Sequence, residues 1–357
     1  MKKLGLFLIP ILIYAMMEID WERIWLPGLY YVVEGKGKTW TEKEVEVIFP
    51  ISSYIQGDEN LYIIEDELTQ EMILELQAKD EERLSEDLLQ EAQAEMDHAV
   101  ASTEISMEKL QDFEYLLSTY YTVDSTTTIG PEQLNAAEML SKDMKLQNSQ
   151  DGPKVLIFHT HSQEAFVDSV AGDTNTSIVG MGKYLAQRLN EIGIETLHHD
   201  GVYDLINGKL DRSKAYELSE IGVKEILNQY PSIEVVIDLH RDGVNENTHL
   251  VKEVDGKQVA KIMYFNGLSR TKANGDISYL YNPYIQDNLA FSFQMQLASE
   301  EMFPGLARRI YLKGYRYSLH MMPKSLLIEA GAQTNTVEEM RNSMDLLAQI
   351  LNRVLKE

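Results

Sequence analysis

Residues 233–242 read Ile-Glu-Val-Val-Ile-Asp-Leu-His-Arg-Asp, an apolar run that ends in polar and charged side chains. β-Branched residues fill its centre, which is typical of a strand buried on both faces of a sheet. Further apolar runs occur at 155–158, 194–197, 259–265 and 326–328, and apolar residues recur at helical spacing within 181–189, 216–230 and 340–354. This alternation predicts an α/β domain with a mostly parallel sheet and flanking helices.

The N-terminal part of the chain has a different composition. Lys2 and Lys3 precede an apolar run from Leu4 to Met17, a pattern of export signals and membrane anchors. Residues 58–97 are strongly acidic and carry apolar residues at helical spacing. We therefore expect a signal or anchor segment at 1–20, an acidic helical stalk region at 21–117 and the α/β domain at 118–357.

Net charge and cysteine content exclude several classes of function. The formal net charge of −25 argues against binding to a nucleic acid, whose phosphates repel a polyanion. The chain has no cysteine, which excludes thiol nucleophiles, disulfides and thiolate metal ligands. Any zinc site must therefore be built from His, Glu and Asp.

Polar side chains follow three of the predicted strands. The first strand leads into His-Thr-His-Ser-Gln-Glu at 159–164, the central one into His-Arg-Asp at 240–242, and a late one into Glu-Ala-Gly at 329–331. Ligands bind beyond the carboxyl ends of the strands in open parallel sheets. We therefore expect these side chains to converge on one edge of the sheet.

Two histidines and a carboxylate form the usual protein ligand set of a catalytic zinc ion. His161, Glu164 and His240 supply that set. On residue pattern alone, His159 can replace His161 as the first ligand. A carboxylate at the end of a buried strand is costly unless it is paired or functional, so Glu329 is predicted to be the general base.

Arg241 and Asp242 directly follow His240, and we expect them to support the ligands or to contact substrate. Arg241 could also clamp a terminal carboxylate, which is a requirement of a carboxypeptidase. A zinc carboxypeptidase is therefore one alternative function, and a non-catalytic binding scaffold is another.

Over roughly residues 118–357 the chain resembles the stage II sporulation protein P family of endospore-forming bacteria. The resemblance rests on 156–164, 236–242 and 327–331, with Asn-Thr at 335–336 and the lead-in Tyr-Thr-Val-Asp-Ser at 121–125. The catalytic domain of the family is similar to zinc-dependent N-acetylmuramoyl-L-alanine amidases. That similarity implies that His161 and His240 are the zinc histidines and Glu329 the catalytic glutamate. His159 is then a residue that supports the ligands or faces the substrate.

In the related amidases the ligand glutamate lies farther along the chain from the first histidine than Glu164 does, so the identity of the carboxylate ligand stays open. The resemblance further implies a peptidoglycan hydrolase that cleaves between the muramic acid lactyl group and L-alanine, with cross-link cleavage as a second activity. Its expected role is septal wall degradation during engulfment. With this substrate, the alternatives are a zinc carboxypeptidase that acts on peptidoglycan stem peptides and a non-catalytic wall-binding scaffold. It is expected to be membrane-anchored on the extracytoplasmic, cell-wall side, with the stage II sporulation proteins D and M as partners.

Overall fold

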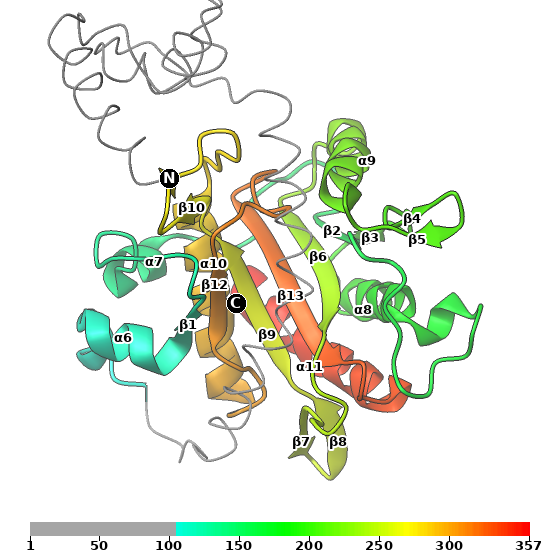
Figure 1. Cartoon of the computed structure of the whole chain (residues 1–357). Coiled ribbons are helices and arrows are strands. Elements are labelled where there is room, and N and C mark those ends of the chain that lie inside the picture. The colour runs from blue at the N-terminus through cyan, green and yellow to red at the C-terminus, as the bar shows by residue number, and fades with distance from the viewer. Residues whose placement is uncertain (1–104) are drawn as a thin grey trace, which may run out of the picture. The chain divides into compact units, whose positions relative to one another are not determined.

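The computed structural model describes residues 105–357, which all belong to one structural unit (Figure 1). The predicted signal or anchor segment at 1–20 and the acidic stretch at 58–97 lie outside the described residues. Within 105–357, none of the helices combines the length and the apolar character that crossing a bilayer demands.

A seven-stranded sheet forms the centre of the unit, with the strand order β1-β12-β9-β13-β6-β2-β3. Its strands are β1 (Tyr121–Val123), β2 (Val155–Phe158), β3 (Thr196–His198), β6 (Val235–Asp242), β9 (Ile262–Gly267), β12 (Ile310–Lys313) and β13 (Lys324–Ala332). Neighbouring strands are parallel except β9 and β13, which are antiparallel. The predicted α/β fold with a mostly parallel sheet is confirmed.

The central strands form where the sequence predicts them, because their apolar residues face both layers of the core. Val235 of β6 pairs with Val155 of β2 on one side and with Lys324 of β13 on the other. The run at 259–265 is interrupted in the structure: it contains the end of β8 (Lys257–Ala260) and the start of β9, with Lys261 between them. β8 pairs with β7 (Val251–Val254) as a hairpin outside the main sheet.

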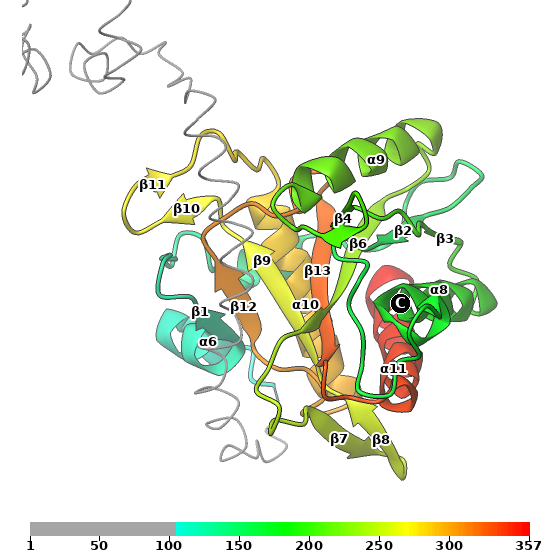
Figure 2. The ribbon, with the colours of Figure 1, turned by 45° about the vertical axis from the view of Figure 1, so that its right-hand side comes forward.

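Helices cover both faces of the sheet (Figures 1 and 2). α8 (Ile178–Glu191), α10 (Ile285–Met302) and α11 (Val337–Leu355) pack with Ile157, Ile237 and Ile328 in the larger core. α9 (Ala215–Gln229) packs with Phe158 and Val236 on the opposite face. Alternate residues of β6 therefore point into different layers, and Asp238 and His240 lie on the same face as Val236, the face that α9 covers.

The remaining elements extend this frame. They are η2 (Lys109–Gln111), α6 (Phe113–Tyr120), α7 (Ala136–Ser141), η3 (Thr174–Thr176) and the small two-stranded pairs β4–β5 (Leu205–Ile206, Lys209–Leu210) and β10–β11 (Arg270–Thr271, Gly275–Asp276). Leu110 and Leu116 are buried in the same core as the central strands. Asp112 caps α6, because its carboxylate accepts a hydrogen bond from the Tyr115 N–H at 2.7 Å.

Candidate metal centre

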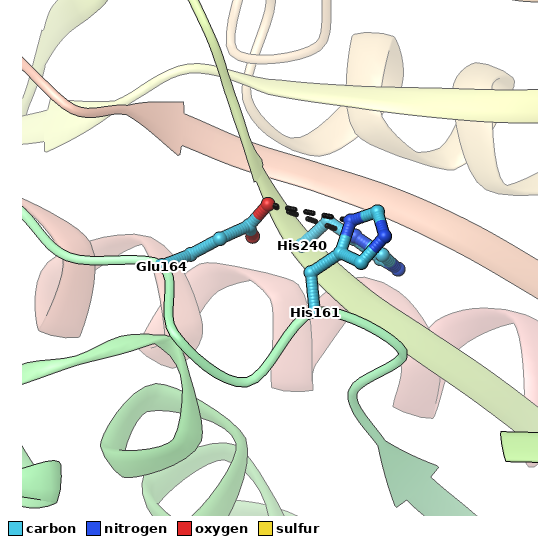
Figure 3. A group of neighbouring side chains, drawn as sticks. All are labelled: His161, Glu164 and His240. Atoms are coloured by element: carbon cyan, nitrogen blue, oxygen red, sulfur yellow. Dashed lines mark ion pairs between the residues drawn. The ribbon is translucent and has the colours of Figure 1, made fainter. Parts of the chain in front are cut away.

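His161, Glu164 and His240 meet at the carboxyl ends of β2 and β6 (Figure 3). One ligand atom from each residue lies within 4.8 Å of the others. Glu164 Oε1 is 3.7 Å from His161 Nδ1 and 4.0 Å from His240 Nδ1. All three side chains are buried, so two imidazoles and one carboxylate already lie together as a group that could hold a metal ion.

The turn that follows β2 brings two of these ligands together. Asp204 stabilises this turn, because its carboxylate accepts hydrogen bonds from Ser162 Oγ at 2.7 Å and from the Gln163 N–H at 3.1 Å. Glu164 Oε2 accepts a hydrogen bond from the Arg241 N–H at 2.8 Å. This backbone bond occupies one oxygen of Glu164 and leaves Oε1 facing the two histidines.

Asp238 connects the two ligand-bearing segments. Its Oδ1 lies 2.8 Å from His240 Nε2 and accepts the Thr160 N–H at 2.9 Å, while Oδ2 accepts from Thr160 Oγ1 at 2.7 Å. A carboxylate on the outer nitrogen of a ligand histidine sets the orientation of the ring and leaves the other nitrogen for the metal. Asp238 therefore aims His240 Nδ1 at Glu164 and also holds the start of the turn that carries His161.

The protonation states of the three side chains depend on one another. Burial alone would lower the pKa of His240, but the carboxylates of Asp238, Glu164 and Glu329 raise that pKa well above its ordinary value. Burial would raise the pKa of Glu164, yet the His161 imidazole beside it and the positive charges of His240 and Arg241 hold that pKa well below the usual range. Glu164 is thus an ionised carboxylate at neutral pH, the form that binds a cation.

Glu329 lies beside the three-residue group without being part of it. It pairs with His240 in the parallel register of β13 and β6, so both side chains lie on the same face of the sheet. The register breaks between Glu329 and Ala332, and Gly331 within this bulge has φ +58°. A Cβ on Gly331 would lie 2.5 Å from Met340 Sδ, so the Glu-Ala-Gly sequence provides the one residue type that fits this bend without strain.

His159 points away from the metal ligands. Its Nδ1 is 2.7 Å from the Leu239 carbonyl, which can only accept, so Nδ1 carries the proton. Its Nε2 is 3.0 Å from His198 Nε2. Burial and mutual repulsion lower the pKa of His159 to about 3, and burial lowers that of His198 to about 4. Gly182 of α8 makes room, since a Cβ there would lie 2.4 Å from His159 Nε2.

Arg241 and Asp242 have different surroundings. The Arg241 guanidinium donates from Nε to the Ala165 carbonyl at 3.1 Å, and its backbone supports Glu164 as described. Asp242 is buried, and its Oδ2 lies 2.6 Å from Nη1 of Arg308. Burial raises the pKa of Asp242 even though Arg308 opposes the rise. The Asp242–Arg308 ion pair is thus a structural contact at the end of β6.

Sequence patterns missed three residues that shape the centre. Asp238 carried a usable signal, because a carboxylate inside a buried apolar strand needs a partner. Asp204 and Arg212 lie in the chain that contains β4 and β5, where no strand-end pattern points to them. Arg212 Nη2 is 3.4 Å from Glu164 Oε1.

Comparison with known proteins places these features in a family. The sequence model for Stage II sporulation protein P matches residues 35–352. Stage II sporulation protein P of Bacillus subtilis (strain 168) is 22% identical over 238 residues, which are 62% of this chain and 56% of that protein. The chain thus spans about half the length of this curated relative.

Two solved structures are also similar to this chain. The CwlD amidase of Clostridioides difficile, in complex with the GerS lipoprotein, is 15% identical with a TM-score of 0.34 and covers 56% of this chain and 99% of its own. The N-acetylmuramyl-L-alanine amidase Ami1 of Mycobacterium abscessus is 13% identical with a TM-score of 0.33 and covers 56% of this chain and 98% of its own.

The family match, which extends over most of the sequence, confirms the membership that the three motifs indicate: the chain belongs to the stage II sporulation protein P family.

Proposed function

We propose that this protein is a peptidoglycan hydrolase, a zinc-dependent N-acetylmuramoyl-L-alanine amidase. The observation that carries the proposal is the buried group of His161, Glu164 and His240, with Glu329 in register beside His240. Two imidazole nitrogens and one carboxylate oxygen are the donor set typical of catalytic zinc sites. Membership of the stage II sporulation protein P family supports this reading.

In this proposal each residue has a separate task. His161, Glu164 and His240 hold the zinc ion, and Asp238 keeps the imidazole of His240 in position. When bound, zinc polarises the scissile carbonyl and lets water act as a nucleophile at neutral pH. Glu329 takes a proton from the attacking water and delivers it to the amine nitrogen of L-alanine as the carbon–nitrogen bond breaks. The products are a free lactyl carboxylate and an intact stem peptide.

The proposed cellular role is septal wall degradation during sporulation engulfment, with cross-link cleavage as a second activity. The family supports that role, and the pattern of residues 1–20 supports a membrane anchor with the catalytic domain on the cell-wall side. The proposed partners are peptidoglycan and the stage II sporulation proteins D and M.

The chemistry can be identified from the products of digestion. Purified protein is incubated with peptidoglycan, and the soluble products are analysed by mass spectrometry. An amidase releases intact stem peptides, a carboxypeptidase releases single amino acids, and a scaffold releases nothing. Absence of intact stem peptides from a metal-loaded preparation would contradict the proposal.

Glu329→Gln tests the general base. The substitution keeps the size of the side chain and removes the proton acceptor, so hydrolysis should fall by about 10²- to 10⁴-fold. Metal content and melting temperature should stay close to those of the unchanged protein, whereas His161→Ala should lose metal. Normal turnover in folded, metal-loaded Glu329→Gln protein would remove Glu329 from the mechanism.

A further inference from the structure

Arg212 approaches the metal centre from the chain between β5 and α9. Its Nη2 lies 3.4 Å from Glu164 Oε1, the oxygen that faces both histidines. The side chain keeps 21% of its surface exposed, whereas that of Glu164 keeps only 4%. Arg212 is therefore a guanidinium that connects the buried ligand group with solvent.

The backbone around Arg212 is fastened to the turn that carries the ligands. The Asp211 N–H donates to the Asp204 carbonyl at 2.9 Å, and the Asp204 carboxylate holds Ser162. On the other side, Asp211 Oδ1 accepts from the N–H and the hydroxyl of Ser213 at 3.0 and 2.6 Å. These bonds hold the backbone on both sides of Arg212, and the contact with Glu164 holds its guanidinium, which reduces the ordering entropy that binding costs.

The guanidinium still has donors to offer. Within residues 105–357, Arg212 Nε is buried and has no hydrogen-bond partner, and Nη2 makes the single contact with Glu164. Nε and Nη2 form one edge of a planar fork that matches the two oxygens of a carboxylate. A buried donor without a partner is costly, and a bound carboxylate would satisfy it.

The surrounding charges mean that an anionic substrate group needs a cation at this position. Glu164, Asp204 and Asp238 are buried close by, and the whole chain has a formal net charge of −25. This environment repels a peptide that carries carboxylates unless a cation beside the metal centre binds one of them. Arg212 has the charge, the position and the spare donors for that task.

We infer that Arg212 binds a carboxylate of the peptide substrate beside the metal centre and thereby selects substrates that carry it. The inference rests on the proposed function, because it takes a peptidoglycan stem peptide as the substrate. It assigns Arg212 a direct contact with substrate, as opposed to the sole task of neutralising Glu164.

The test uses two muropeptides that differ in one group. One carries a free α-carboxylate on the second stem residue, and the other is amidated at that carboxyl. We expect the unchanged protein to prefer the free carboxylate by about 10- to 100-fold in kcat/KM, mostly through KM, as for a hydrogen-bonded charge pair. Arg212→Gln should abolish the preference, and Arg212→Lys, which keeps the charge without the fork, should retain part of it.

Binding is measured separately from hydrolysis. Calorimetry of both muropeptides with metal-loaded Glu329→Gln protein, with and without Arg212→Gln, should show the same carboxylate dependence in Kd. Lys209→Gln is the matched control, because it removes one exposed cation from the hairpin that precedes Arg212 and should leave the preference unchanged.

Two results would overturn the inference: equal affinity of the Glu329→Gln protein for the two muropeptides, or an equal loss of affinity for both on Arg212→Gln. The second would mean that Arg212 acts only through Glu164. If carboxylate-dependent binding disappears with Arg212 while the unchanged protein hydrolyses neither muropeptide, the inference stands and the amidase proposal fails.

Discussion

Gly331 determines how β13 continues past Glu329. Its φ of +58° is one that L side chains adopt at a cost of about 1–2 kcal/mol. A methyl group there would also lie 2.5 Å from Met340 Sδ and 3.0 Å from the Ala260 Cβ. We expect Gly331→Ala to lower the free energy of unfolding by more than the backbone cost alone, measured by urea denaturation.

Gly172→Ala is the control for this prediction. Gly172 also has a positive φ, of +83°, and a Cβ there meets nothing within 4 Å. Its substitution should cost only about 1 kcal/mol, for the backbone. Equal losses in the two variants would mean that Met340 moves aside for the new methyl group at no cost.

Asp238 is the residue on which both histidine ligands depend. Replacing its carboxylate with an amide in Asp238→Asn removes the negative charge that orients His240, which lies 2.8 Å away. Outer carboxylates of this kind typically contribute 10- to 100-fold in metal affinity, and we expect a loss of about that size in chelator competition. Thr160→Val, which removes one donor to Asp238 but leaves the contact with His240, should lose less. Unchanged affinity in Asp238→Asn would show that the ring is oriented by its packing alone.

At the scale of single elements, α11 begins with a capping box. The Thr336 hydroxyl accepts the Glu339 N–H at 3.2 Å, and Glu339 Oε2 accepts the Thr336 N–H at 2.9 Å. Burial would raise the pKa of Glu339, but the hydrogen bonds from Thr336, Asn335 and His249 lower it below its ordinary value. A lowered folded-state pKa means that the ionised Glu339 stabilises the helix above the unfolded pKa of about 4.3 and loses that effect as the pH falls through the folded pKa.

We therefore expect Glu339→Gln to lower stability at pH 7, and the difference from the unchanged protein to shrink as the pH falls below about 4. Thr336→Ala should cost about 1 kcal/mol at both pH values, because its hydroxyl does not titrate. Thermal denaturation at several pH values measures the stability difference between each variant and the unchanged protein. A Glu339→Gln difference that stays constant down to low pH would contradict the prediction.

The sequence predicts the elements whose apolar pattern is regular. β2, β6 and β13 form at the predicted runs, and α8, α9 and α11 at the predicted helical spacings. α10 is absent from the prediction because it is buried on most sides, so its apolar residues show no stripe. Polar residues within it are buried as well: Ser292 donates to Asn266 at 2.5 Å and Ser299 donates to the Met295 carbonyl at 2.8 Å. From the sequence alone, such polar residues are predicted to lie on the surface.

The candidate site was predictable to the extent that its residues follow strands. His240 and Glu329 end apolar runs, and His161 and Glu164 lie in the turn that follows another, at the edge where a parallel sheet gathers polar groups. The choice between His159 and His161 was open by pattern, because it depends on how the chain turns after Phe158. The role of Arg212 could not be predicted from the sequence. Its approach to Glu164 depends on a tertiary contact, in which Asp204 binds Ser162 in the turn after β2.

At the scale of the whole molecule, metal binding should be coupled to stability, because the ligands come from two separate segments of the sheet. A ligand that binds only the folded state adds about 2.7 kcal/mol at a concentration 100 times its Kd. We expect zinc to raise the melting temperature of the unchanged protein and to leave that of His161→Ala unaffected. His249→Ala, which removes a half-exposed histidine paired with Glu339, should keep the zinc effect. An equal rise in the His161→Ala protein would place the zinc elsewhere.

The direction of the sheet was only partly accessible from sequence. Parallel pairing of β2, β6 and β13 follows from the alternation of strands and helices. The chain reverses after the β7–β8 hairpin, however, so that β9 enters the sheet antiparallel to β13. That reversal depends on tertiary packing. One contact that holds it is the hydrogen bond from the Gly331 N–H to the Lys261 carbonyl, at 2.8 Å, just before β9 begins.

The position of β13 also has a consequence for the order in which the protein can mature. β13 follows the other six strands of the sheet in the chain, and it lies between β9 and β6 in the middle of the sheet. A nascent chain that has not reached residue 332 leaves the facing edges of β9 and β6 without their final partner. His161, Glu164 and His240 are synthesised well before Glu329. A chain synthesised only as far as residue 328 can therefore carry all three proposed metal ligands and still lack its proposed proton acceptor, so that the proposed hydrolysis requires synthesis to have passed through β13.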